Sequence, residues 1–518
     1  MKHLILLLIA FSFLQLKAQT PVDTFWHLKS FNKKGFAAIN YYEALEFVKS
    51  QNPTEVIVAV IDAGVDVYHP DLQDRLWFNP NEITNNGIDD DGNGYIDDLY
   101  GWNFIGDVTF DNLEITRQYV KLNKEFELQN KIGVEAAAYE TLKDIVLSER
   151  REAKFIFEIL QQAKFGFEFL EDEYSKNITR DILEKHKSNN VYEERARLVL
   201  LNSAPKKSTF DYIKTRDETL EAFNQYDYLY NYAYNPKFDS RKEKVGDDYT
   251  NVEERIYGNN KVYYGKRFSE HGTHVAGIIA ANSSNNYGAK GICQNCKIMS
   301  IRAVPEGDER DKDVANSIYY AVDNGAMVIN MSFGKAYVNN LAAVEKAIAY
   351  AQTKNVLIVH GSGNDGKNND ENINYPNDFG GKYGANWIEV GASSWQSKPK
   401  AIAEFSNYGK KEVDVFAPGV AIYSTLPEET YEALDGTSMA SPVVAGAAAF
   451  LWSYFPSLTA KEIKNIITST ASPLKGRHRK PGSIRKTRLK RVSKSGGIIN
   501  LYEAAKRADE ITKGRDSK

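Results

Sequence analysis

Three short motifs hold side chains that can carry out nucleophilic catalysis. Asp62 ends an apolar run, His271 opens the segment HGTHVAG, and Ser438 lies in GTSMASP ahead of a run of alanines. A serine hydroxyl is a poor nucleophile at neutral pH and needs a neighbouring base, and a carboxylate can hold that base in the correct tautomer. The three residue types therefore predict a catalytic triad, provided that the fold brings them together.

Each motif taken alone also has a simpler interpretation. An aspartate at the end of a strand often caps a helix, and His271 with His274 would suit two ligands of a zinc ion. Zinc is disfavoured because no third ligand follows at a recognisable spacing and Gly272 weakens the helical turn. Ser438 is expected at the start of a helix, where free N–H groups favour a developing oxyanion.

Residues 87–98 (GIDDDGNGYIDD) form an acidic loop with the spacing Asp-x-Asp-x-Asn-Gly. This spacing turns alternate oxygens inward around a glycine, as in an EF-hand loop. Position twelve of the pattern is Tyr100 instead of a bidentate glutamate, and Asp98 is the candidate substitute. The loop predicts a structural Ca²⁺ site, with a solvated acidic turn as the alternative and no cofactor expected for catalysis. The candidate ligands are Asp89, Asp91, Asn93, the carbonyl of Tyr95, and Asp97.

The elements that must position these residues alternate along the chain. Residues 56–61 are a continuous apolar run rich in β-branched side chains, typical of a strand buried on both faces. Strands alternating with helices indicate an α/β fold with a parallel sheet, whose active site gathers at the carboxyl ends of the strands. Shorter apolar runs follow at 327–329, 356–359 and 388–390, with helical patterns at 313–324 and 341–353 between them.

A change of composition separates the first motif from the second. Residues 111–240 contain 20 Lys and Arg and 24 Asp and Glu, but only two of the 35 glycines. Few chain breakers and many good helix formers predict long helices. We interpret residues 107–260 as an inserted, mainly α-helical subdomain; a solvated helical hairpin without a role of its own is the alternative.

The first 18 residues have the pattern of a secretory signal peptide. A positive head precedes an apolar run at 4–14, and Ala18 marks the expected cleavage site. The run is too short to span a bilayer and no other stretch is longer, so we expect a secreted or periplasmic protein without a membrane span. A buried N-terminal helix is the alternative for this segment. Cys293 and Cys296 are candidates for a disulfide loop in an oxidising compartment.

The overall charge excludes some classes of partner. The 65 Lys and Arg against 69 Asp and Glu give a net charge of −4, which provides no global case for nucleic-acid binding. Two cysteines exclude a disulfide-rich scaffold. Residues 475–494 hold ten Lys and Arg and no acid. We expect a flexible, solvated loop there, with contact to anionic envelope polymers as the alternative; the oligomeric state is not indicated.

Taken together, the motifs resemble those of the subtilisin-like serine endopeptidases (subtilase family). The order Asp62, His271, Ser438 is the order found in subtilisin. The resemblance covers roughly residues 50–105 and 265–505, and it implies a catalytic domain in two parts, 19–106 and 261–518. It also includes residues 58–71, 331–334 (MSFG), 363–366 (GNDG) and 416–419 (FAPG).

The resemblance implies a role for each site residue. His271 would take the proton of Ser438, Asp62 would orient the imidazole, and Asn364 would share the oxyanion hole with the Ser438 backbone N–H. An extended polypeptide substrate would pair with one strand, with residues 307–312 as the opposite wall. That strand is Ser332, Phe333 and Gly334.

Two departures from the family pattern, together with the large insertion, motivate a rival interpretation. Ala63 stands where the family usually has Thr or Ser, so we expect reduced but not abolished activity. About 35 residues separate Gln19 from the first strand, too few for the family's usual folding propeptide. The rival is a catalytically idle relative that serves as a binding or assembly module.

Overall fold

A computed structural model describes residues 23–31, 37–129, 134–203, 210–285 and 287–516. The predicted signal peptide, residues 1–18, lies outside the described residues. The chain forms two compact units. One is the helical unit Phe110–Asp239, and the other, the catalytic unit, comprises Pro21–Thr109 and Ser240–Lys518.

A nine-stranded sheet organises the catalytic unit, in the order β10-β13-β7-β6-β5-β4-β1-β3-β2. Its pairs are parallel except β10 with β13. The predicted α/β fold with a parallel sheet is confirmed. The strands are β1 (Val56–Asp62), β2 (Gly101–Asn103), β3 (Cys296–Arg302), β4 (Val328–Met331), β5 (Leu357–Gly361), β6 (Trp387–Ser393), β7 (Val415–Pro418), β10 (Ser472–Pro473) and β13 (Gly497–Ile498).

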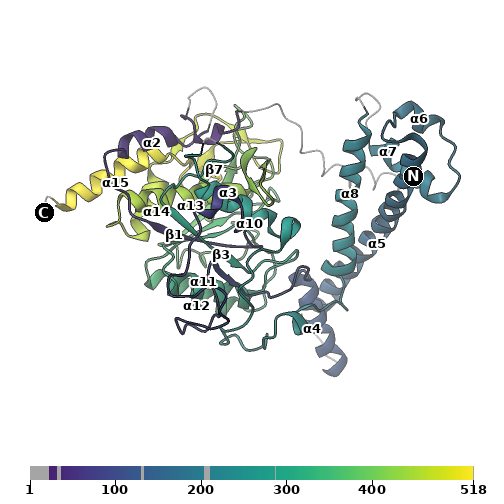
Figure 1. Ribbon diagram of the computed structural model, residues 1–518, viewed down its shortest axis with the longest axis horizontal. Helices are drawn as coiled ribbons and strands as arrows, with labels where there is room; N and C mark the ends of the chain where they lie inside the picture. Colours follow the sequence, from purple (N-terminus) through teal and green to yellow (C-terminus); the bar gives the residue numbers. More distant parts are fainter. Residues whose placement is uncertain (1–22, 32–36, 130–133, 204–209, 286, 517–518) are drawn as a thin grey trace. The chain divides into compact units, whose positions relative to one another are not determined.

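Helices cover both faces of the sheet, which explains the continuous apolar runs of its strands (Figure 1). On one face, Val58 and Val60 of β1 share a core with α10 (Gly265–Ala280) and α13 (Thr437–Tyr454). On the other face, Ala59 and Ile61 share a core with α11 (Asp311–Asp323) and α12 (Leu341–Thr353). Alternate residues of β1 therefore anchor opposite helical layers.

Shorter elements complete the catalytic unit. The segment 475–494 forms the antiparallel hairpin β11–β12 and a short helix, with Arg479 paired to Glu404 at 3.0 Å. This differs from the expected solvated loop. The elements are η1 (Trp26–Leu28), α2 (Tyr41–Val48), α3 (Pro70–Gln73), α9 (Arg241–Lys244), β8 (Ile422–Leu426), β9 (Thr430–Leu434), α14 (Ala460–Ser469), β11 (His478–Arg479), β12 (Lys486–Thr487), η3 (Leu489–Arg491) and α15 (Leu501–Asp516).

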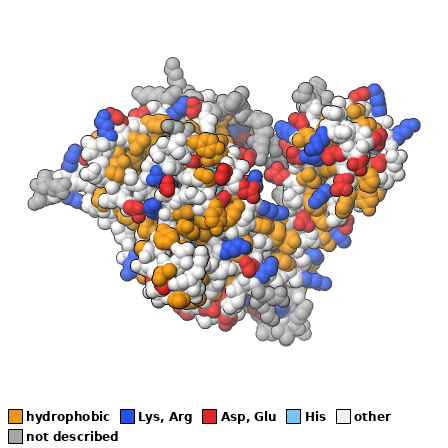
Figure 2. Space-filling view, in the orientation of Figure 1, with side chains coloured by type: hydrophobic (Ala, Val, Ile, Leu, Met, Phe, Trp, Pro, Cys, Tyr) orange, Lys and Arg blue, Asp and Glu red, His pale blue; other side chains and the backbone are white. Residues whose placement is uncertain are grey.

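The helical unit confirms the predicted helical insertion. Its longest helix, residues 134–174, packs against the helices at 191–203 and 212–228. The buried residues of this unit include Leu170, Leu183 and Leu200. Acidic and basic side chains alternate over its visible face (Figure 2). Its elements are α4 (Glu114–Gln129), α5 (Val134–Tyr174), α6 (Arg180–Lys185), α7 (Val191–Ser203), α8 (Tyr212–Tyr228) and the π-helix η2 (Leu229–Ala233).

Residues 240–260, which the predicted bounds assign to the insertion, belong to the catalytic unit. Arg241 binds Asp313 of α11 through two nitrogens, each at 2.7 Å. Lys312, almost fully buried, binds Asp247 at 2.8 Å and Glu254 at 2.7 Å. Each buried charge has a partner, as burial requires. These ion pairs, whose partners cannot be identified from amino-acid composition, assign the segment to the catalytic unit.

Cys293 and Cys296, the first residue of β3, are joined by a disulfide, with their Cα atoms 5.5 Å apart. Among the described residues, every helix is too short or too polar to cross a membrane.

Candidate active site

Asp62 and His271 meet at the carboxyl end of β1. The Nδ1 atom of His271 lies 2.8 Å from Oδ1 and 3.0 Å from Oδ2 of Asp62. The carboxylate also accepts the backbone N–H of Ala63 at 2.7 Å. Gly272 permits this approach, because a Cβ there would lie 2.2 Å from the carbonyl oxygen of Gly64. Helix α10 can therefore bring its histidine against the end of the strand only with a glycine at this position.

The charge of Asp62 controls the protonation of His271. Asp62 is 3% exposed and the His271 side chain 40%. Burial of the ring opposes its protonation, but the charge and the hydrogen bond of Asp62 outweigh burial and raise the pKa of His271. Such a pair stabilises an imidazolium, the species that a histidine base forms when it accepts a proton.

The neighbouring His274 has a different environment. Its Nε2 lies 3.0 Å from the carbonyl oxygen of Glu432 in β9, and the residue is fully buried. Burial lowers the pKa of His274 to about 3. Among the described residues, His271 and His274 belong to no group of three potential metal ligands, so the zinc interpretation of the HGTH pair finds no support here.

Ser438 is the second residue of α13, and its side chain is half-buried. Its Oγ donates a hydrogen bond to the carbonyl oxygen of Ser332 at 3.0 Å, and the Oγ of Ser332 donates to the Ser438 carbonyl at 3.0 Å. The structure thus brings Ser438 to the predicted substrate strand. Its backbone N–H lies in the first helical turn, where N–H groups have no acceptor within the helix.

Asn364 is fixed beside this helix start. Its Oδ1 accepts the backbone N–H and the Oγ1 hydroxyl of Thr437, both at 2.9 Å. These two bonds engage the oxygen of the carboxamide and leave the Nδ2 group as the outward donor. Asn364 is exposed. Its partner Thr437 directly precedes Ser438 in α13. The amide donor predicted for an oxyanion hole is therefore held next to the predicted nucleophile.

The predicted substrate strand, Ser332–Gly334, directly follows β4. The carbonyl of Phe333 accepts a hydrogen bond from Nε2 of the buried His360 at 2.7 Å. Lys335 then pairs with Tyr375 through two backbone hydrogen bonds of 2.9 Å. Along an extended chain alternate residues face opposite sides. With Phe333 bonded inward, Ser332 and Gly334 face the side on which a substrate would pair.

The predicted opposite wall, residues 307–312, divides between two elements. Residues 307–310 precede α11, whereas Asp311 and Lys312 begin that helix. Asp311 is tied to the end of the substrate strand by Lys335, at 2.7 Å.

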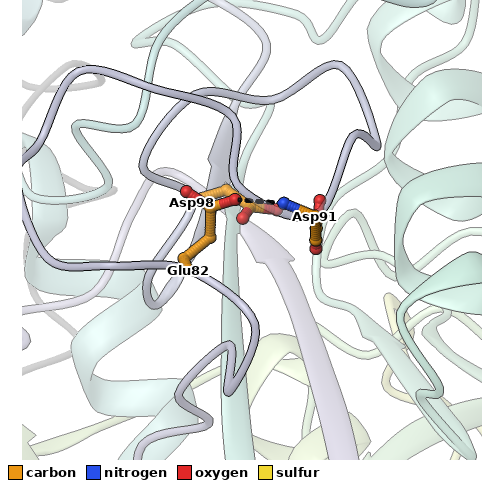
Figure 3. A group of neighbouring side chains, drawn as sticks. All are labelled: Glu82, Asp91 and Asp98. Atoms are coloured by element: carbon orange, nitrogen blue, oxygen red, sulfur yellow. Dashed lines mark hydrogen bonds between the residues drawn. The ribbon is translucent and has the colours of Figure 1, made fainter.

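The acidic loop brings together different carboxylates from those predicted. Asp89 accepts the N–H groups of Asn93 and Gly94, and Asp97 accepts those of Asn86 and Gly87, so both stabilise turns of the loop. Asn93 and Tyr95 likewise hydrogen-bond within the loop. The carboxylates of Glu82, Asp91 and Asp98 instead lie within 4.8 Å of one another (Figure 3).

A comparison with protein families decides the relationship of the chain. The model described as Peptidase_S8, the subtilase family, matches residues 54–497. The chain belongs to the subtilase family. This subtilase matches its family model on both sides of the helical unit, as the sequence motifs predict.

Several curated relatives are similar over part of the chain. Subtilisin DY of Bacillus licheniformis is 40% identical over 39% of this subtilase and 71% of its own length. Thermitase of Thermoactinomyces vulgaris is 41% identical over 40% of this chain and 68% of its own. The thermophilic serine proteinase of Bacillus sp. (strain AK1) is 40% identical, and the aligned region spans 48% of its length. Family and relatives together support a serine-type endopeptidase.

The acidic group suits a hard cation in this subtilase. The amide Nδ2 of Asn79 bridges Asp91 and Asp98 at 3.0 and 2.7 Å, and that of Asn93 bridges them at 3.1 and 3.2 Å. Both carboxylates are thus held together by shared hydrogen-bond donors. Burial raises the pKa of Asp98 to about 6, although three side chains donate to it. A set of oxygen ligands matches Ca²⁺.

Only Asp91 of the predicted metal ligands belongs to this group, with Asp98, the candidate substitute. Glu82 is the member that sequence reasoning missed. It lies before the loop and outside the Asp-x-Asp spacing, so no local pattern marks it. Its Oε1 accepts the N–H of Asp90 and its Oε2 that of Asp97, contacts that depend on how the chain folds back.

Proposed function

We propose that this subtilase is an exported endopeptidase that hydrolyses peptide bonds through an acyl-enzyme on Ser438. The observation that carries the proposal is the Asp62–His271 hydrogen bond at 2.8 Å. Beside it stands the start of α13, where Ser438 is the second residue and Asn364 is hydrogen-bonded to the first. A binding module would need neither a buried carboxylate under a histidine nor a fixed amide beside a helical serine.

The residues act in a defined order. His271 takes the hydroxyl proton of Ser438 as its Oγ bonds to the substrate carbonyl carbon, and Asp62 stabilises the imidazolium. The carbonyl oxygen becomes an oxyanion, which accepts hydrogen bonds from Asn364 Nδ2 and the Ser438 N–H. The C–N bond then breaks, and the departing amine takes the proton from His271. Water, deprotonated by His271, releases the acyl group and restores the serine.

Substrate binding relies on main-chain pairing. Ser332 and Gly334 present backbone groups to one edge of an extended polypeptide, and such pairing recognises backbone without regard to sequence. For the attack on substrate, the Ser438 hydroxyl leaves the Ser332 carbonyl, which becomes available to the substrate backbone.

Export is supported by two separate features. The sequence pattern of residues 1–18 is that of a signal peptide, and the Cys293–Cys296 disulfide suits an oxidising compartment. We propose that Ca²⁺, held by Glu82, Asp91 and Asp98, stabilises the fold without entering the reaction. Contact of residues 475–494 with anionic envelope polymers stays an untested alternative.

A fluorophosphonate probe tests the proposed chemistry, because it labels only an activated serine. We expect the full chain to be labelled and to cleave a peptide library, and both activities to vanish in Ser438→Ala. Ser469→Ala, at the last residue of α14 and outside the three site motifs, is the matched control and should behave as the wild type. Folded wild-type protein, verified by circular dichroism, that is neither labelled nor active would support the idle binding module instead.

A further inference from the structure

A fully buried histidine supports the substrate strand from beneath. His360 of β5 is 0% exposed, and the strand register places it between Met331 of β4 and Glu389 of β6. Its Nε2 lies 2.7 Å from the Phe333 carbonyl oxygen, and its Nδ1 lies 2.9 Å from Glu389 Oε2. The reaction steps described above do not use this pair.

The hydrogen bonds determine the number of protons on the ring. A carbonyl oxygen only accepts, so Nε2 must carry a hydrogen. Glu389 Oε2 accepts the indole N–H of Trp387 at 2.9 Å, and as a carboxylate oxygen with a second lone pair it accepts from Nδ1 as well. Both ring nitrogens therefore donate, and the ring is an imidazolium paired with a carboxylate.

The groups around the ring favour that charge. Burial opposes protonation, but the charge and hydrogen bond of Glu389, the Phe333 carbonyl and the charge of Glu309 raise the pKa of His360. Trp387 packs against the ring at 5.2 Å between centroids.

The nearby cations are engaged elsewhere. Lys464 and Lys494 bind Asp414, which accepts the N–H of Glu389, at 3.0 and 3.1 Å. Lys335 binds Asp311 and the Glu309 carbonyl. The carboxylate of Glu389 is thus the direct counterion of the imidazolium.

We propose that His360 is a positioning residue that holds the substrate strand in its binding geometry, and that only its imidazolium form does so. The inference rests on the proposed peptidase function, because it concerns how the substrate strand binds. Nε2–H bonds the carbonyl of Phe333 on the inner side of the strand. Ser332 and Gly334, on the alternate side, are thereby aligned for the substrate backbone.

Loss of the ring proton releases the strand. At a pH above the raised pKa, the remaining hydrogen stays on Nδ1, facing the negative charge of Glu389. Nε2 then turns a lone pair toward the Phe333 carbonyl, and the two repel. The contact is complete below the ordinary pKa of about 6.5 and is lost as the pH rises through the raised value. Substrate binding should weaken at alkaline pH while the chemical step persists.

Steady-state kinetics with a peptide substrate between pH 6 and 10 test the proposal. For the wild type we expect KM to rise about three- to tenfold at alkaline pH, the effect of one net hydrogen bond, with kcat changed much less. His360→Ala should have the high KM at every pH. His360→Gln, whose amide donates without titrating, should restore a low KM that is independent of pH.

A variant of the counterion separates charge from shape. Glu389→Gln keeps an oxygen for Trp387 but removes the negative charge, so the rise in KM should move to lower pH. A wild-type KM that is flat with pH, or a folded His360→Ala protein with the wild-type KM, would overturn the proposal.

Nuclear magnetic resonance of ¹⁵N-labelled histidine tests the protonation state without turnover. At pH 6 the ring of His360 should show two N–H groups, and a single one would contradict the proposed imidazolium. If fluorophosphonate labelling fails, the proposed peptidase function is contradicted. The resonance measurement still reports the protonation state of the His360 ring. If labelling succeeds and substitution of His360 leaves KM unchanged, only the positioning role is contradicted.

Discussion

Ala63 gives the clearest prediction at the scale of single residues. The Asp62 carboxylate accepts the Ala63 N–H and pairs with His271, but Ala63 offers no side-chain hydroxyl. Ala63→Thr should raise kcat about threefold by adding a donor that orients the carboxylate. Ala63→Val has the same branched shape without the hydroxyl and should give no gain. Equal turnover of the two variants would contradict the argument.

The protonation of His271 sets the acid side of the pH profile. The base must be neutral to accept a proton, and its pKa lies above the ordinary 6.5 because of Asp62. We therefore expect kcat/KM to fall as the pH drops through a midpoint above 6.5. In Asp62→Asn the midpoint should move to lower pH and kcat should fall by about 10⁴, as for the matching change in a trypsin-like triad. An unmoved midpoint in that variant would assign the titration to another group.

Local motifs revealed those site residues whose role depends on a short segment. Asp62, His271, Ser438 and Asn364 each lie in a recognisable stretch, and the fold pairs Asp62 with His271 and holds Asn364 next to Ser438. The sequence did not reveal His360, because this residue follows an apolar strand run and belongs to no recognisable motif. Its partner Glu389 is known only from the register of β5 and β6, which no single segment encodes.

At the scale of elements, the acidic loop distinguishes two sets of metal ligands. Addition of Ca²⁺ should raise the melting temperature by about 5 °C, and a chelator should reverse the shift. Glu82→Gln should abolish the shift because Glu82 belongs to the carboxylate group. Asp89→Asn should retain it because Asp89 bonds to backbone N–H groups of the loop. The opposite pattern would restore the EF-hand-like ligand set.

The same scale shows why some elements were predictable and others were not. The central strands are buried on both faces, so each appears as an apolar run. The hairpins β8–β9 and β11–β12 carry polar residues, and β11 and β12 have two residues each, too few for a periodicity. Packing against the rest of the catalytic unit gives them their structure. The hydrogen bond from Arg479 to the Pro399 carbonyl, 2.7 Å long, is one such contact.

At the scale of the whole molecule, the helical unit should be separable. Each unit has its own apolar core, and the chain leaves and re-enters the catalytic unit at adjacent points, where the Asp107 N–H donates to the Lys244 carbonyl at 3.3 Å. Replacement of Phe110–Asp239 by a short flexible linker should leave a folded protein that fluorophosphonate still labels. The isolated segment should melt cooperatively by circular dichroism.

Two results would contradict this separation. Loss of labelling in a folded, shortened protein would show that the helical unit contributes to the active site. Failure of both parts to fold alone would show that their cores depend on each other.

The position of β1 in the sheet has a consequence for the order of folding. The strand that ends in Asp62 lies between β3 and β4 in the sheet, and their registers pair Val56 with Cys296 and Val58 with Val328. During synthesis β1 is made before the helical unit, and its two partner strands are made after that unit. The strand therefore has no partner until the helical unit is complete. Contacts so distant in sequence close slowly, whereas the helices of Phe110–Asp239 form from local contacts. The helical unit should therefore fold first, and peptidase activity should arise only once the later half of the chain encloses the earlier strand.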